Sequence, residues 1–88
     1  MAICFIFDVP GATQAQYEQV HNQVTPNNQR PAGMLSHLAG PSENGWCVVE
    51  MWESPEAAQR FFEETLKQPL EQAGLMVQPK TFQVQNTM

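Results

Sequence analysis

The chain lacks any long hydrophobic run and any excess of basic residues. None of its apolar stretches approaches the roughly 20 residues that a membrane-spanning helix needs, and no basic segment precedes the first apolar stretch as in a signal peptide. Nine acidic residues face four basic ones, for a formal net charge of −5, whereas nucleic acids and anionic membranes attract basic patches. We therefore expect no membrane partner, no secretion signal and no nucleic-acid partner.

The chain is also poor in cysteine and has no glycine-rich nucleotide motif. Its two cysteines, Cys4 and Cys47, form no Cys-x-x-Cys pair, and neither His21 nor His37 stands at zinc-finger spacing from them. We expect two free thiols in strands, with no disulfide because strand alternation turns them to opposite faces. The absence of Gly-x-Gly-x-x-Gly disfavours flavin and nicotinamide, so we expect neither cofactor nor metal. Free thiols are typical of a cytoplasmic protein.

What the chain does contain suits one small globular domain. Its 88 residues are 42% apolar, which supports one modest hydrophobic core. We therefore expect residues 1–88 to form a single domain.

The periodicity of the first third predicts a strand and then a helix. The stretch from Ala2 to Asp8 is almost continuously apolar, which is typical of a central strand. Thr13 fits a helix cap and Pro26 ends the helix, because proline cannot continue the backbone ladder. Between them, one helical stripe is formed by Tyr17, Val20, His21 and Val24.

The rest of the chain predicts a hairpin, a second helix and a last strand. Asn44-Gly45 is a hairpin signal between strands at 33–39 and 46–53. Ser54 and Pro55 open the second helix, which continues to Gly74 despite Pro69. Its expected buried stripe is Ala58, Phe61, Phe62, Thr65 and Leu66. Alternation over 80–86 predicts the last strand.

This order, β-α-β-β-α-β, predicts an α+β fold of the ferredoxin-like type, a four-stranded antiparallel sheet with both helices on one face. Both alternating sets of strand residues are apolar, so the uncovered face would be a large apolar patch. We expect that face to form a homodimer. On the third strand we expect Val49 and Met51 to face the helices, and Glu50 and Trp52 to face away from them.

Several segments together resemble a known superfamily. They are Gly33 and His37 on the second strand, Gly45-Trp46, and Val49-Glu50-Met51-Trp52-Glu53-Ser54-Pro55-Glu56-Ala57. With the element order and length, they resemble the dimeric α+β barrel superfamily, and within it the antibiotic biosynthesis monooxygenase-like proteins. The resemblance implies a dimeric barrel in which each sheet's open face forms half the barrel, and a cavity between that face and a helix or loop.

One group of residues is a candidate site. Glu50 and Trp52 share a face because they are two apart on a strand, and His37 lies on the neighbouring strand. We assign His37 and Glu50 as catalytic candidates, and Trp52 and Tyr17 as substrate-binding candidates. Each has a structural alternative: Trp52 and Tyr17 as core, His37 as a structural histidine, and Glu50 hydrogen-bonded across the dimer. His21 is expected to be solvated or to cap its helix.

Three functions stay open. The resemblance suggests a cofactor-independent monooxygenase for a small aromatic or polyketide-like molecule, with His37 removing a phenolic proton. A non-enzymatic dimeric ligand-binding or stress-related protein is the alternative. A haem-binding or haem-degrading relative is less favoured, because such relatives carry an asparagine on the first strand and this strand offers only Asp8. The loop from Thr25 to Ala32 is expected to be mobile and to cover the pocket.

Overall fold

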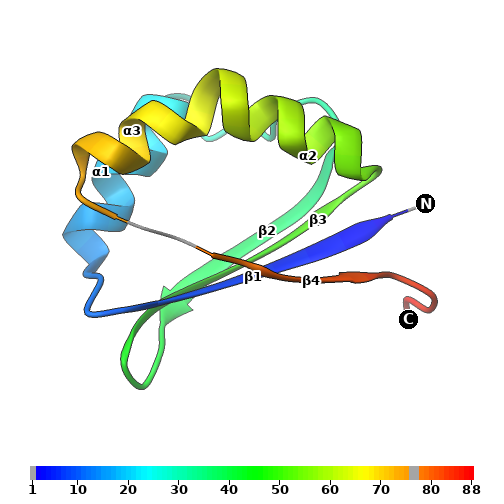
Figure 1. Ribbon diagram of the computed structural model, residues 1–88, viewed down its shortest axis with the longest axis horizontal. Coiled ribbons are helices and arrows are strands. Elements are labelled where there is room, and N and C mark those ends of the chain that lie inside the picture. Colours follow the sequence, from blue (N-terminus) through cyan, green and yellow to red (C-terminus); the bar gives the residue numbers. More distant parts are fainter. Residues whose placement is uncertain (1, 76–77) are drawn as a thin grey trace.

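The protein folds as a four-stranded antiparallel sheet with its helices stacked on one face (Figure 1). The computed structural model describes residues 2–75 and 78–88. The strand order β2-β3-β1-β4 is that of the ferredoxin-like fold, so the predicted fold is confirmed. The elements are β1 (Ile3–Pro10), α1 (Gln14–Val24), β2 (Met34–Pro41), β3 (Gly45–Trp52), α2 (Pro55–Phe61), the π-helical turn η1 (Phe62–Leu66), α3 (Lys67–Gln72) and β4 (Lys80–Gln83).

Both helical segments begin where the capping residues predict. Thr13 and Gln16 form a reciprocal capping box before α1, and the Ser54 hydroxyl accepts from the Ala57 amide before α2, where proline occupies the first turn. Each cap satisfies amides that the helix itself leaves without partners, and so fixes the start of the helix. No helix among the described residues is long and apolar enough to cross a membrane.

The predicted apolar stripe of the second helix is only partly correct. Ala58 is buried and Phe61 packs on the core, but Phe62 and Thr65 are exposed. From Phe62 the regular helix gives way to η1, one wide turn that precedes Pro69. A proline ring clashes with the carbonyl four residues earlier, and a wider turn relieves that clash. The wider turn also rotates the following residues away from a regular helical stripe.

The face assignment of the sheet is the main correction. Trp52 is 1% exposed and packs with Met34 and Ala58 beneath the helices, with Ile3 and Phe5 beside them. The prediction that Glu50 and Trp52 share a face is right, but the prediction that they face away from the helices is wrong. The larger side chains fill the space under the helices.

The opposite face therefore carries the other alternating set. It comprises Cys4 and Ile6 on β1, Leu38 on β2, Val49 and Met51 on β3, and Phe82 on β4. The helices do not cover this face, and on it Leu38 is 65% exposed and Phe82 is 53% exposed (Figure 1). The apolar face that the dimer hypothesis requires is present.

Both cysteines are free, as expected, but for a different reason. They lie on the same face, not on opposite faces. Cys4 pairs with Met51, and Cys47 pairs with Asp8 four residues further along β1. Four strand residues span roughly 13 Å, whereas a disulfide needs Cα atoms within about 7 Å.

The hairpin between β2 and β3 turns one residue earlier than the Asn44-Gly45 signal predicts. Ser42 and Gly45 form the closing backbone pair, so Glu43 and Asn44 are the central turn residues. Gly45 is required for another reason: a Cβ atom there would lie 2.1 Å from the Val9 carbonyl oxygen. The glycine lets the hairpin approach the end of β1.

Candidate functional site

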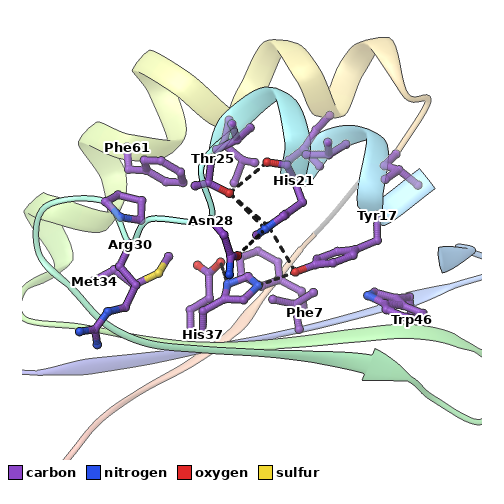
Figure 2. A pocket seen from close by; sticks show the side chains of 18 of the residues that line it. Phe7, Tyr17, His21, Thr25, Asn28, Arg30, Met34, His37, Trp46 and Phe61 are labelled. Atoms are coloured by element: carbon purple, nitrogen blue, oxygen red, sulfur yellow. Dashed lines mark hydrogen bonds and ion pairs between the residues drawn. The ribbon is translucent and has the colours of Figure 1, made fainter. Parts of the chain in front are cut away.

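A cavity of about 270 Å³ lies between the sheet and the helices (Figure 2). Its walls are mainly apolar, and they include Phe7, Val20, Val48, Phe61, Leu66 and Leu70. Its polar residues come from α1, from the loop after it, and from β2 and β3: Tyr17, His21, Thr25, Asn28, His37 and Glu50. An apolar cavity with a few converging polar groups is the usual form of a small-molecule site.

The pair His37 and Glu50 stands at the floor of this cavity. The two residues are direct partners in the β2–β3 register. His37 Nδ1 lies 3.1 Å from Glu50 Oε2, and Trp52 Nε1 donates to Glu50 Oε1 over 3.1 Å. Glu50 is 7% exposed, and a buried carboxylate needs such donors on its oxygens. Trp52 and His37 together hold the carboxylate in one orientation.

A β-bulge places His37 on this side of the sheet. Met34 pairs with Trp52, but Ser36 pairs with Met51, so one residue of β2 is unmatched between them. Met34 and His37 are three residues apart and would lie on opposite faces of a regular strand. The extra residue brings both beneath the helices, one into the core and the other into the cavity.

Tyr17 reaches down from the first turns of α1 to His37. Its Oη atom lies 2.7 Å from His37 Nε2. Burial, and secondarily the Glu50 carboxylate, raise the pKa of the Tyr17 phenol above its ordinary value. Tyr17 is therefore a protonated hydroxyl at neutral pH, able to donate a hydrogen bond to the imidazole.

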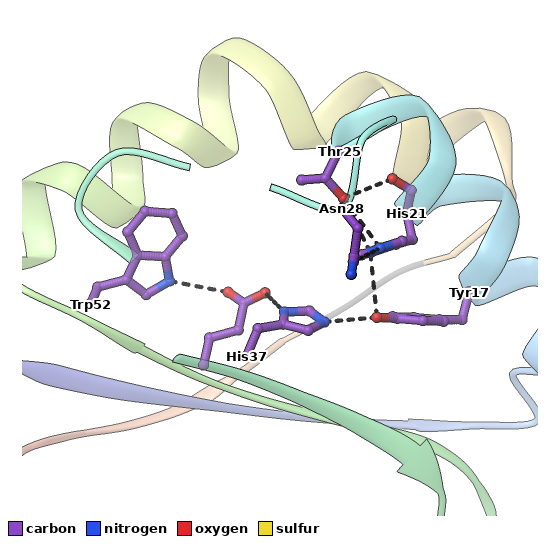
Figure 3. Close-up of polar contacts among 7 residues, drawn as sticks. Tyr17, His21, Thr25, Asn28, His37 and Trp52 are labelled. Atoms are coloured by element: carbon purple, nitrogen blue, oxygen red, sulfur yellow. Dashed lines mark hydrogen bonds and ion pairs between the residues drawn. The ribbon is translucent and has the colours of Figure 1, made fainter. Parts of the chain in front are cut away.

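The network continues into a cluster that the sequence did not predict (Figure 3). His21 Nδ1 lies 3.4 Å from Tyr17 Oη and 3.2 Å from Thr25 Oγ1, and His21 Nε2 lies 2.9 Å from Asn28 Oδ1. The only sequence signal was spacing, since Tyr17 and His21 are four apart on one helical stripe. His21 belongs to the cavity and is not the solvated helix-edge residue that we expected.

The four predicted site residues thus have different positions. His37, Glu50 and Tyr17 line the cavity, and His37 contacts each of the other two. Trp52, which we expected to bind substrate, is a core residue that contacts Glu50 and is not among the residues that line the cavity. The cavity lies under the helices and not on the open sheet face, because the face assignment was reversed.

The loop after α1 forms one wall of the cavity, which agrees with its predicted place over the pocket. Its residues Thr25, Asn28, Gln29, Arg30 and Pro31 line the wall. Asn28 adopts a φ of 55°, a left-handed conformation that asparagine tolerates better than most residues. Whether the loop moves stays a prediction.

Charge is scarce around the cavity. Arg30 is the one lysine or arginine among the described residues of the lining, and its guanidinium donates to the Leu35 carbonyl oxygen at the exposed margin. Among the described residues, no three histidine, cysteine or acidic side chains gather in a way that could hold a metal ion. The cavity thus favours a neutral, largely apolar molecule.

Comparison with known proteins gives structural relatives only. No protein-family model matches the sequence, and no curated protein matches it. The cofactor-independent oxygenase SnoaB from Streptomyces nogalater superposes with a TM-score of 0.70 at 18% identity, over 99% of this chain and 96% of that one. Candidate antibiotic biosynthesis monooxygenases from Chloroflexus aurantiacus J-10-fl and Deinococcus radiodurans give TM-scores of 0.70 and 0.68 at 12% and 13% identity. Both cover 100% of this chain, and 97% and 96% of their own.

This protein has the fold of the antibiotic biosynthesis monooxygenase-like proteins. The match runs the full length of the chain, so the resemblance seen in the sequence is confirmed at the level of fold. At these identities the likeness establishes a monooxygenase-like architecture, whereas the chemistry must be argued from the cavity.

Proposed function

We propose that this protein is a cofactor-independent monooxygenase that binds a small, flat hydroxyaromatic molecule in the cavity between helices and sheet. His37 and Glu50 are the proposed acid–base pair, Tyr17 the substrate contact, and Trp52 the residue that fixes Glu50. The observation that carries the proposal is the hydrogen-bonded His37–Glu50 pair at the floor of an apolar cavity. The fold shared with SnoaB, a cofactor-independent oxygenase, supports it.

The chemistry follows from removal of a phenolic proton. A phenolate is electron-rich and can reduce molecular oxygen itself, so neither flavin nor nicotinamide is required. For 1-naphthol the balanced reaction is naphthol plus O₂ giving 1,4-naphthoquinone plus water, with one of the two atoms of O₂ entering each product. An imidazole oriented by a carboxylate is suited to take the proton near neutral pH.

The cavity limits the size and charge of the molecule. About 270 Å³ lies just below the roughly 300–1,000 Å³ typical of pockets for drug-sized ligands. One or two fused rings suit that space better than an extended polycyclic polyketide. The scarcity of cations in the lining disfavours carboxylates and phosphates as substituents.

We also propose that two copies associate through their open sheet faces, and that the protein is cytoplasmic. The exposed Leu38 and Phe82, together with the apolar residues between them, form a face that a soluble monomer would rarely expose. Two free thiols favour a reducing compartment.

A non-enzymatic ligand-binding role is the second candidate. Both nitrogens of His37 already have partners within the protein, an arrangement that would also serve a purely structural network. Oxygen turnover separates the two candidates, because a binding protein would hold the aromatic molecule without consuming oxygen.

The test measures oxygen uptake and quinone formation with 1-naphthol, together with binding by thermal shift. We expect His37→Gln and Glu50→Gln to lower kcat/KM by about 100-fold or more, the usual size of a general-base contribution. Glu43→Gln is the matched control, because it makes the same chemical change at an exposed turn. Binding without oxygen uptake by the wild-type protein would favour the ligand-binding candidate.

A further inference from the structure

His37 has no free nitrogen for a bound molecule. Its Nδ1 atom lies 3.1 Å from Glu50 Oε2, and its Nε2 atom lies 2.7 Å from Tyr17 Oη. A substrate hydroxyl therefore cannot give its proton directly to His37 while Tyr17 stays in place. The hydroxyl of Tyr17, whose side chain lines the cavity, stands between the imidazole and any occupant.

The hydrogen atoms in this network have one consistent order. A carboxylate only accepts, so His37 must donate from Nδ1 to Glu50. A neutral His37 then accepts at Nε2, and the single hydroxyl hydrogen of Tyr17 points to it. The Tyr17 oxygen can then take part in further hydrogen bonds only as an acceptor, through its lone pairs.

From this order, and resting on the proposed function, we propose that Tyr17 relays the substrate proton to His37 and that His21 positions the Tyr17 oxygen. In the relay, the substrate O–H gives its proton to Tyr17 Oη while Tyr17 gives its own proton to His37 Nε2. The products are a substrate phenolate, an intact Tyr17 hydroxyl and a doubly protonated His37 paired with Glu50. No atom is oxidised or reduced in this step, and the total charge is unchanged.

The raised pKa of Tyr17 suits this role. A relay must remain a neutral hydroxyl between transfers, and burial together with the Glu50 carboxylate disfavours the phenolate form of Tyr17. The hydroxyl therefore passes a proton on without keeping a negative charge.

His21 is placed to hold the Tyr17 oxygen. Because Tyr17 uses its hydrogen on His37, it can only accept from His21 Nδ1, which lies 3.4 Å from it and shares its N–H with Thr25 Oγ1 at 3.2 Å. The two rings stack with centroids 5.4 Å apart, so the histidine also limits rotation of the phenol. The Asn28 side chain, whose Oδ1 atom lies 2.9 Å from His21 Nε2, holds the other side of the ring.

A buried donor without a partner marks the same part of the cavity (Figure 2). Trp46 Nε1 is buried and has no hydrogen-bond partner within residues 2–75 and 78–88. Its ring centroid lies 5.4 Å from that of Tyr17. Buried donors are nearly always paired in native proteins. An oxygen atom bound beside Tyr17 would give this N–H the acceptor that it lacks.

The experiment uses 4-nitrophenol, whose phenol and phenolate forms differ in absorbance, and 4-nitroanisole, which has the same ring and no acidic proton. We expect nitrophenol bound to the wild-type protein to be more ionised than free nitrophenol at the same pH. Tyr17→Phe and His37→Gln should each lower the ratio of bound phenolate to bound phenol roughly tenfold or more, the scale of a hydrogen bond to a charged group. His21→Gln should lower it about threefold, the scale of a neutral hydrogen bond.

Nitroanisole and a surface variant are the controls. Nitroanisole transfers no proton, so its affinity for each variant measures the effect of the substitution on binding alone, apart from its effect on ionisation. Ser42→Ala removes a hydroxyl that donates to Asp8 outside the cavity, and it should change neither probe.

Three outcomes would overturn the relay. If nitrophenol bound to Tyr17→Phe is as ionised as in the wild type, the probe reaches His37 directly. If it is as ionised in His37→Gln, His37 is not the proton acceptor. If neither probe binds the wild-type protein, the cavity is not the binding site. The measurement needs no oxygen, so absence of oxygen uptake would defeat the proposed function and leave this result intact.

Discussion

The same substitution, tryptophan to phenylalanine, should have very different effects at Trp52 and at Trp46. At Trp52 it removes a hydrogen bond to a buried carboxylate, worth about 1.5–3 kcal/mol. It also leaves a void around a side chain that is 1% exposed, which we take as a further ~1–2 kcal/mol, below the 3–5 kcal/mol of truncation to alanine. The expected loss is about 3–5 kcal/mol, a large share of the roughly 5–15 kcal/mol that stabilises a small domain.

At Trp46 the same substitution removes a buried N–H that has no partner within the described part of the chain. Relief of that unpaired donor, about 1–3 kcal/mol, offsets the lost packing, so the free energy of unfolding should change by about 1 kcal/mol or less. Urea unfolding followed by circular dichroism measures both variants. On thermal unfolding, Trp52→Phe should lower Tm by roughly 12–30 °C and Trp46→Phe by only a few degrees.

A double-mutant cycle separates the hydrogen bond from the packing. In a Glu50→Leu background the buried Trp52 N–H has already lost its acceptor, so Trp52→Phe should cost the packing term less the relief of that unpaired donor, about 1–3 kcal/mol as at Trp46. The coupling energy between the two substitutions, the hydrogen bond plus this relief, should therefore be about 2.5–6 kcal/mol. Equal losses for Trp52→Phe and Trp46→Phe, or a coupling near zero, would refute this account of the buried carboxylate.

Three further predictions follow from single features of the fold. Tyr17 is the single tyrosine of the chain, so titration of the tyrosine absorbance follows it alone, and its pKa should lie above the ordinary value near 10. The stability linked to its protonated form is present below about pH 10 and should fall as the pH rises through the folded pKa, as urea unfolding at a series of pH values would show. Leu38→Glu with Phe82→Glu should convert a dimer to a monomer of unchanged helix content; light scattering that finds only monomer in the wild type would contradict the proposed interface. Gly33→Ala should destabilise by roughly 2 kcal/mol or more, measured by thermal unfolding, because φ is +89° and the new Cβ would lie 2.8 Å from Ala57 Cβ; an unchanged Tm would refute this.

Local signals in the sequence were enough to predict the fold. Thr13, Pro26, Ser54 and Pro55 act on neighbouring backbone groups, so their effect does not depend on distant parts of the chain. The alternation of strand residues likewise places Glu50 with Trp52, and the element order leaves few topologies to consider. The prediction that Glu50 and Trp52 share a face was therefore correct.

Which face would lie under the helices was decided only by tertiary packing. Both alternating sets on the strands are apolar, so hydrophobicity alone gives no preference between them. The bulge in β2 is equally hidden in the sequence, although it alone brings Met34 and His37 to the same side. The contact of His21 with Tyr17 and Asn28 depends in turn on where α1 and its loop settle over that face. Spacing along the chain determines which side chains can meet, but the packing of helices on the sheet determines which of them do, because only packing fixes the phase of each strand relative to the core.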